Sequence, residues 1–346
     1  MKKGIKRNFV LAMIAVAGIG QGYAQDPQYT QFYANQQILN PAFAGAALGP
    51  RVSMNYRAQW VAVPGSYRQQ AASYDQPLLV GRAKTQQGIG GTITRDLAGE
   101  GNLSKLTMNV NYSFAMQFGR KGYEQHLRLG LGGGIEQSSI DLTRLRFSDQ
   151  IDPREGFVRA TQEVPPQASR FNPDVHFGTV YYNRMAWAGV SVHHLTEPYQ
   201  SFITTSRSDS LRLPRRYTVT AGLRIPVGPQ NDPEKISISP AFLFMKQRNF
   251  NQLNIGAYVN INPMVFGMWF RTNYNNFDGR FVNSDMLAGL IGFRQGIFSI
   301  GYSYDYTISA LGNSITGGSH ELALILEFER NKPSSFRHRN LPCPRY

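Results

Sequence analysis

Hydrophobic and polar residues alternate with a period of two along most of this chain. Between positions 217 and 225 the odd positions are apolar or aromatic, whereas the even positions are Thr218, Thr220, Gly222 and Arg224. The same alternation occurs at 253–262, 298–306 and 320–329. Because successive side chains of a strand point to opposite faces, the pattern predicts strands with one apolar and one polar face.

The alternation predicts fourteen strands between Arg51 and Glu329. They lie near residues 51–60, 68–76, 87–96, 104–118, 125–139, 172–181, 185–194, 215–226, 235–246, 250–261, 265–274, 284–293, 297–306 and 319–329.

Three features favour a transmembrane antiparallel β-barrel over a soluble β-sandwich, which remains the alternative. The strands have about ten residues, the length that a tilted bilayer crossing needs. Their polar faces hold Gly, Ser, Asn and Thr, which are typical of a barrel lumen. The apolar face of 298–306 ends in Tyr302, Tyr304 and Tyr306, as in an aromatic girdle at lipid headgroups. We therefore expect an all-β membrane protein.

The lengths of the connections give an independent check on the strand count. The connections at 183–184, 262–264 and 294–296 are tight, whereas those at 140–171, 195–214, 275–283 and 307–318 are long. Outer-membrane barrels have short periplasmic turns and long outer loops. The alternation of short and long connections mostly follows that rule. The short connection at 247–249 breaks it, and those after the second and eighth strands are longer than expected.

The first 24 residues predict a secretory signal peptide. A basic start is followed by an apolar stretch from Phe9 to Ile19 and by small residues at Gly22 and Ala24. Cleavage after Ala24 would leave residues 25–50 as an N-terminal periplasmic or plug segment before the barrel at 51–329. An uncleaved anchor helix is the alternative. Export and the barrel pattern together predict the outer membrane as the location.

Composition narrows the classes further. The 346 residues carry a formal charge of +14, and 42% of them are hydrophobic, which excludes a disordered chain. The single cysteine excludes a disulfide scaffold and a cysteine-based zinc domain. Without the four basic residues of the signal peptide, 32 basic and 22 acidic residues leave a charge of +10.

The C-terminal segment 330–346 is a basic tail without acidic residues, and we expect it in the periplasm. Its basic residues are Arg330, Lys332, Arg337, Arg339 and Arg345. Because an exported protein does not meet chromosomal DNA, we expect anionic lipid or an acidic protein face as its partner, and no nucleic acid. A solvated tail is the alternative. Cys343 could pair with a partner protein or remain a free thiol.

Groups that resemble metal or catalytic sites are better explained by the barrel. His193 and His194 are adjacent in a predicted strand, so we expect their side chains to point to opposite faces as rim histidines. The run His320–Leu324 lacks the second histidine of the zinc-protease motif. We therefore expect no metal, no cofactor and no catalytic residue. Asp305 and Glu321 are expected in the lumen, in a polar network with an arginine such as Arg224, and His320 at the outer rim.

Five short motifs occur in order outside and within the predicted barrel. They are Asp26-Pro27 followed by Gln28-Tyr29, the box Asn40-Pro41-Ala42-Phe43-Ala44-Gly45, the strand Tyr304-Asp305-Tyr306, the run Thr316-Gly317-Gly318-Ser319-His320-Glu321, and Cys343-Pro344 in the basic tail. Together they make the chain similar to the PorP/SprF family of outer-membrane proteins in the type IX secretion system of Bacteroidetes. The similarity extends over essentially the whole mature chain.

The resemblance implies a non-enzymatic component of type IX secretion, often linked to gliding motility. Its implied partners are the translocon, the periplasmic ring proteins and the C-terminal domain of a secreted adhesin-type cargo. We expect cargo at the outer connections 140–171 and 195–214, and the ring at the N-terminal segment and the tail, with outer-membrane lipid around the barrel. The rival hypothesis is a passive outer-membrane pore for small solutes, which the small polar lumen face favours.

Overall fold

The structure is a computed structural model of the whole chain. It describes Asp26 and residues 28–78, 85–120, 123–145, 147–152, 154–159, 161, 169–200, 202, 212–227, 236–275, 281–310 and 312–328. The predicted signal peptide, Pro27 and the basic tail lie outside the described residues. Their predicted roles therefore stay predictions, including those of Cys343, Pro344 and the five basic residues of the tail.

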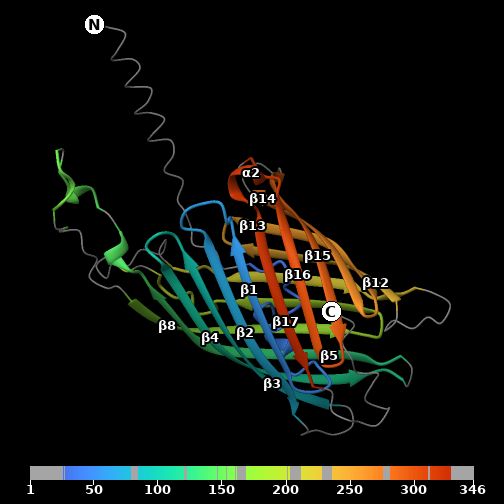
Figure 1. Ribbon diagram of the computed structural model, residues 1–346. Helices are drawn as coiled ribbons and strands as arrows, with labels where there is room; N and C mark the ends of the chain where they lie inside the picture. The colour runs from blue at the N-terminus through green and yellow to red at the C-terminus, as the bar shows by residue number, and fades with distance from the viewer. Residues whose placement is uncertain are drawn as a thin grey trace.

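Fourteen strands form the wall of the molecule, which confirms the predicted strands (Figure 1). They are β1 (Arg51–Gln59), β2 (Tyr67–Leu78), β3 (Thr85–Ala98), β4 (Leu103–Phe118), β5 (Gln125–Ser139), β8 (Ser169–Tyr182), β9 (Ala186–His193), β10 (Arg216–Leu223), β12 (Ile236–Gln247), β13 (Phe250–Ile261), β14 (Met264–Asn275), β15 (Phe281–Gln295), β16 (Phe298–Thr307) and β17 (Ser319–Glu327). The short β11 (Ile225–Pro226) follows β10 and pairs with the same neighbour, β12. In the β5–β8 connection, β6 (Ile151–Asp152) and β7 (Gly156–Phe157) pair with each other.

The helical elements of the described chain are single turns. They are η1 (Gln36–Ile38), η2 (Pro41–Phe43), η3 (Leu142–Arg144), η4 (Ser148–Gln150) and α2 (Asn313–Thr316). In the part of the chain that the structure describes, no helix has the length and apolar character to cross a bilayer.

The strands close into an antiparallel barrel. β1 pairs with β17 from Arg51↔Glu327 to Gln59↔Ser319, which joins the first strand to the last. β10 pairs with β12 from Arg216↔Gln247 to Gly222↔Ala241. These two pairings complete the ring, so the described wall has no free edge. Closure removes the unpaired backbone groups that lipid cannot satisfy.

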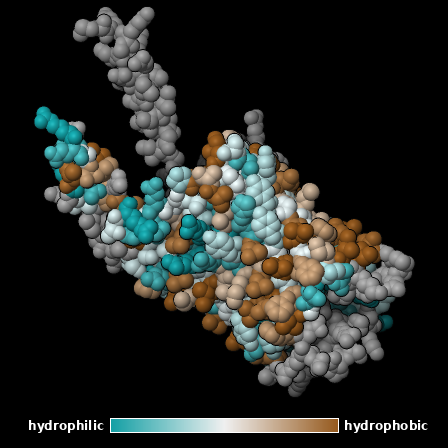
Figure 2. Space-filling view, viewed as in Figure 1, coloured by the Kyte–Doolittle hydropathy of each residue, from teal (hydrophilic) through white to brown (hydrophobic). Residues whose placement is uncertain are grey.

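The two faces of each strand separate as the alternation predicts. The outward positions carry large apolar side chains, and Figure 2 shows hydrophobic residues spread over the wall. Tyr217, Ile255 and Ile300 are about half exposed at 46%, 53% and 46%. The inward neighbours Thr218 and Asn254 are buried. An exterior this apolar is typical of a wall that faces lipid.

Alternate connections lie at the same end of the barrel because neighbouring strands are antiparallel. We call the end with the β16–β17 connection the α2 end, since α2 lies there (Figure 1). It also holds the β1–β2, β3–β4, β5–β8, β9–β10, β12–β13 and β14–β15 connections. Most long connections are at the α2 end, and the tight β8–β9, β13–β14 and β15–β16 turns are at the opposite end.

The lumen is filled by the N-terminal segment, which we call the plug (Asp26 and residues 28–50). Almost all of its side chains are buried, although it contains only the short helices η1 and η2. Asp26 contacts the wall at the α2 end, and the plug leads into β1 at the opposite end. The plug therefore runs through the whole length of the barrel, and its contacts with the wall form the core of the protein.

Candidate functional site

The contacts between plug and wall are the candidate functional site, and they begin with charges at the α2 end. Asp26 Oδ1 lies 3.1 Å from Lys105 Nζ, and Asp26 Oδ2 lies 2.9 Å from Arg216 Nη1 and 2.6 Å from His194 Nε2. Asp174 Oδ2 lies 2.7 Å from the other ring nitrogen of His194. We call these five residues the Asp26 cluster. The Asp26 carboxylate of the plug thus contacts side chains at the ends of three strands, β4, β9 and β10.

The cluster shifts the pKa values of its two groups outside the strands. Burial favours a neutral Asp26, but His194, Lys105 and Arg216 outweigh burial and hold the pKa of its carboxyl well below the usual range. Burial likewise disfavours a charged His194, but attraction to Asp26 and hydrogen bonds to both aspartates raise its pKa to about 9. At neutral pH the cluster therefore contains a buried carboxylate–imidazolium pair.

A second group of charges lies where the barrel closes. Arg57 of β1 lies 2.5 Å from Asp305 of β16 and 3.4 Å from Glu321 of β17. The Thr30 hydroxyl accepts from Arg57 at 2.7 Å and donates to Asp305 at 2.7 Å. The backbone N–H groups of Thr30 and Gln31 donate to the Glu321 carboxylate. We call these five residues the Arg57 cluster, and all of them are buried.

Aromatic side chains fill the middle of the lumen. Phe32 and Tyr33 of the plug pack against Trp269 of β14, with ring centroids 4.9 Å and 5.7 Å apart. Tyr33 also contacts Trp187 of β9 edge-on at 5.6 Å and Tyr258 of β13 at 5.7 Å. Buried aromatic rings contribute large apolar area and prefer such edge-to-face arrangements. This packing makes the middle of the plug a conventional hydrophobic core.

The Asn40–Gly45 box contacts the wall through its first residue. The Asn40 side chain caps η2, because its oxygen accepts from the backbone N–H of Ala42 at 2.9 Å. Its amide also donates to the carbonyl oxygens of Thr179 in β8 and Val190 in β9, each at 3.1 Å. A Cβ atom at Gly178 would lie 2.1 Å from the Asn40 oxygen. The box therefore packs against the wall where Gly178, which has no side chain, leaves room for Asn40.

The last residue of the box turns the chain at the opposite end. Gly45 has φ +61, and a Cβ atom there would lie 2.5 Å from the carbonyl oxygen of Gln76, so only glycine fits without strain. Its N–H donates to the buried carboxylate of Asp75 at 2.9 Å, and Arg51 Nε lies 3.0 Å from the same carboxylate. Arg128 donates to the carbonyl oxygens of Ala42 and Ala44.

The Tyr304–Glu321 motifs lie on both faces of the closing strands. Asp305, Ser319 and Glu321 face the lumen and are buried, whereas Tyr306 faces outward. His320 lies on the outer wall near the α2 end, where its Nδ1 is 2.7 Å from the Tyr302 hydroxyl.

The connection before β17 is held by the other residues of these motifs. Gly317 and Gly318 both have φ +70. Tyr304 accepts a hydrogen bond from the Asn313 amide at 2.9 Å. The backbone N–H of Trp60 donates to the Gly318 carbonyl, which ties this connection to the β1–β2 connection. The positive φ of Gly317 and Gly318 thus explains why glycine occupies these two positions.

Two expectations about individual side chains are wrong. The arginine of the Asp305–Glu321 network is Arg57, because Arg224 lies at the opposite end of the barrel, in the cavity described below. His193 and His194 do not point to opposite faces, because both are buried at the plug. β9 ends at His193, and φ +59 at His194 turns its side chain back inward.

Sequence reasoning missed Arg57, Arg51 and Arg128 as plug or network residues, although a signal existed. Arg57 shares its parity in β1 with Arg51, Ser53 and Asn55, which together form a polar inward face. Among the described residues, no group of three His, Cys, Asp or Glu side chains is arranged to hold a metal ion.

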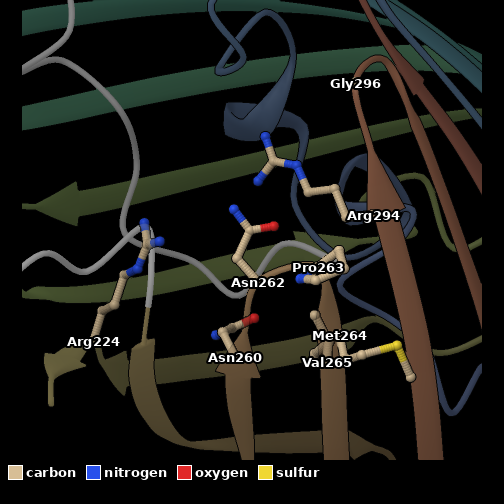
Figure 3. Close-up of a pocket in the computed structure, with 8 residues that line it drawn as sticks. All are labelled: Arg224, Asn260, Asn262, Pro263, Met264, Val265, Arg294 and Gly296. Atoms are coloured by element: carbon tan, nitrogen blue, oxygen red, sulfur yellow. The ribbon is translucent and has the colours of Figure 1, made fainter. Parts of the chain in front are cut away.

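The opposite end contains a cavity of about 180 Å³. Figure 3 shows Asn260 and Asn262 between Arg224 and Arg294, beside the β13–β14 turn. Pro263, Met264, Val265 and Gly296 complete its lining. The lining of this cavity is therefore mostly polar and carries two basic residues.

Comparison with known proteins identifies the family. Among solved structures, the chain is similar to the toluene transporter TbuX of Ralstonia pickettii, with 13% identity, a TM-score of 0.45, and coverage of 85% of this chain and 94% of that chain. It is also similar to the outer membrane protein Omp33 of Acinetobacter baumannii, with 6% identity, a TM-score of 0.42, and coverage of 82% and 100%. No curated protein matches the chain. The family described as "Type IX secretion system membrane protein PorP/SprF" matches residues 21–326. The chain therefore belongs to the PorP/SprF family of type IX secretion system membrane proteins.

Proposed function

We propose that this protein is a non-enzymatic docking component of type IX secretion in the outer membrane. It helps to export adhesin-type cargo or to hold it at the cell surface, and it links the outer membrane to the periplasmic ring. In cells that glide, the same role serves gliding motility. Binding, without bond chemistry, is sufficient for this role.

The observation that carries the proposal is the filled lumen. The plug has ion pairs or hydrogen bonds to the wall at both ends and an aromatic core between them. A barrel filled in this way offers surfaces at its two ends, whereas a passive pore needs an aqueous path through its lumen. This supports docking over the alternative of a solute pore.

Loop lengths support placing the α2 end outside the cell and the opposite end in the periplasm. Cargo would then bind the β5–β8 and β9–β10 connections. In the described part of the β5–β8 connection, Ile151, Phe157 and Val158 are about half exposed. Apolar side chains exposed together on a loop favour protein contact.

The ring would bind the opposite end, through the basic surface around Arg224 and Arg294 and through the tail. The expectation that the N-terminal segment also binds the ring changes here, because the barrel wall covers the described plug. Charge complementarity to an acidic ring surface would direct the association.

A block deletion of Asn331–Tyr346 tests the ring contact. Trimming residues singly is less informative, because the remaining basic residues compensate. We expect the shortened protein to fold, shown by its heat-dependent gel shift, and to lose co-purification with ring proteins and export of the adhesin. Unchanged export and unchanged ring association in a folded variant would refute this part of the proposal.

Conductance in a planar bilayer tests docking against the pore. We expect the purified full-length protein to be closed or nearly closed. A stable, ion-selective open pore would favour the passive channel. Mass spectrometry of proteins that co-purify in detergent would identify the cargo.

A further inference from the structure

The outer wall carries a group of basic and polar side chains near the α2 end. Ala58 of β1 pairs with His320 of β17 on one side and with Arg68 of β2 on the other. All three point outward, since the inward neighbours Arg57 and Gln69 are buried. Adjacent strands lie about 4.8 Å apart, so Arg68 and His320 flank the small Ala58 at roughly 10 Å from each other.

A second arginine extends this group onto β3. Gln70 pairs with Arg95, and Arg68 pairs with Leu97, so the two arginines are diagonal neighbours on the outer face. Diagonal neighbours lie about 7–8 Å apart, within reach of one small anion for long side chains. Both arginines are exposed. Neither forms an ion pair with any acidic residue that the structure describes.

The level of this group on the wall is marked by aromatic residues. Tyr56 precedes Ala58 on the same face and is 45% exposed. Trp60 and Tyr67 pack edge-on at 5.7 Å beside it. Aromatic girdles lie at the headgroups. An arginine on the lipid face is costly at the bilayer midplane but is well tolerated near the interface. Arg68 and Arg95 therefore lie where charged headgroups are.

His320 completes a set of donors. The Tyr302 hydroxyl lies 2.7 Å from Nδ1 of His320, so Nε2 is the ring nitrogen that is left to face a ligand. Arg68 and His320 flank the short Ala58 side chain, and Arg95 lies diagonally beyond Arg68 on β3. Guanidinium groups match phosphate oxygens in two-pronged hydrogen bonds. A bound phosphate group would supply the negative charge that the two arginines do not find on the described acidic residues.

We propose that Arg68, Arg95 and His320 bind a phosphate of a phosphorylated glycolipid in the outer leaflet, at the level of the aromatic girdle. The proposal rests on the orientation with the α2 end outside. It does not depend on cargo or ring binding. Bound glycolipid would fix the vertical position of the seam where β1 meets β17.

The test is lipid binding by the full-length protein in detergent, measured by native mass spectrometry. The probes are bisphosphorylated lipid A, its dephosphorylated form, phosphatidylglycerol and inorganic phosphate. The variant is R68Q/R95Q, and R120Q/R184Q is the matched control, because Arg120 and Arg184 are exposed at the opposite end. We expect the wild type and the control to bind one lipid A, and the variant to bind at least about tenfold more weakly.

Several outcomes decide the proposal. Equal binding of lipid A by R68Q/R95Q and wild type would overturn it, as would equal binding of the dephosphorylated form. Preference for phosphatidylglycerol would refute an outer-leaflet glycolipid, and displacement of lipid A by millimolar inorganic phosphate would show a free-anion site instead. H320A provides a milder variant, expected to weaken lipid A binding several-fold with a normal heat-dependent gel shift. Loss of cargo export with normal lipid binding would contradict the docking function and leave this inference standing.

Discussion

At the scale of single residues, Arg57 balances two carboxylates in the closed seam of the barrel. Asp305 and Glu321 come from β16 and β17, and both are buried with Arg57. Burying charge is expensive unless each charge keeps a partner and its hydrogen bonds. Thr30 and Gln31 supply the additional hydrogen bonds from the plug. The cluster therefore couples closure of the wall to the position of the plug.

Replacing Arg57 with Met should destabilise the barrel by about 3–5 kcal/mol, because two buried carboxylates lose their cation. The measurement is the temperature at which the heat-dependent gel shift is lost. The variant R57M/D305N/E321Q, which removes all the charges together, should recover much of that loss. Equal stability of R57M and wild type would show that the carboxylates are neutral or solvated.

The raised pKa of His194 predicts how the stability of the protein depends on pH. Its pKa is raised from 6.5 to about 9 in the folded protein. The contribution of the charged His194 to the stability of the folded protein is therefore complete below about pH 6.5 and disappears as the pH rises through about 9. Its full size is on the order of 3 kcal/mol. Asp26, whose pKa is lowered, contributes in the opposite sense and loses its contribution only in acid.

The wild type should therefore lose thermal stability between pH 6.5 and 9.5, whereas H194Q should be less stable and nearly flat over this range. H320A is the control, because His320 lies outside the Asp26 cluster and should keep the slope of the wild type. A wild-type stability that does not change over this range would contradict an imidazolium at His194.

At the scale of elements, the strands could be predicted with their positions, whereas the plug could be predicted only as one of two alternatives and its structure could not be predicted. A strand that separates lipid from lumen repeats its pattern every second residue, so β10, β13 and β16 are evident in the sequence. The plug has no period, because its short helices and extended stretches meet a different wall surface at each residue. Even so, glycines recur at inward positions next to the plug, as at Gly88 of β3 and Gly130 of β5. The missing side chains indicate that another segment packs against these strands, but they do not identify that segment.

The positions of the side chains in the candidate functional site could likewise be predicted only in part from the sequence. Asp305 and Glu321 could be placed in the lumen by parity, but the choice of Arg57 over Arg224 needs the order in which strands close. His194 could not be placed by parity at all, because φ +59 breaks the alternation at the end of β9.

The fit of the plug can be tested with two glycines of one strand. A Cβ atom at Gly130 would lie 2.1 Å from the backbone nitrogen of Ala42, whereas at Gly133 it would meet only the Asp174 carbonyl at 3.8 Å. We expect Gly130→Ala to displace the plug and to cost about 1–3 kcal/mol. Chymotrypsin cleavage at Phe32, Tyr33 or Phe43 should accelerate clearly. Gly133→Ala should behave like the wild type, and equal cleavage of both variants would contradict the close packing at Ala42.

At the scale of the whole molecule, most of the buried cations near the plug have an acidic partner on the wall itself and do not depend on the plug for one. Four cations that contact the plug or its cluster each keep an acidic partner on the wall. The pairs are Arg57 with Asp305 and Glu321, Arg51 with Asp75, Lys105 with Glu136, and His194 with Asp174. Arg128 keeps the Ser113 hydroxyl. The plug thus adds contacts to a wall on which these four cations are already paired, whereas the buried Arg216 pairs with Asp26 of the plug.

This pairing predicts that deletion of residues 28–44 leaves a folded barrel with an open lumen. Water would solvate the inward polar faces, as in barrels with aqueous channels. The deletion variant should keep a heat-dependent gel shift and conduct at least about tenfold more than the full-length protein in a planar bilayer. The matched control is deletion of Asn331–Tyr346, which should leave conductance unchanged. If the variant without the plug did not fold, the plug would be part of the nucleus of the barrel; if it folded but stayed closed, other parts of the chain would block the lumen. The expected result, a folded and open barrel, would mean that the plug alone closes the lumen.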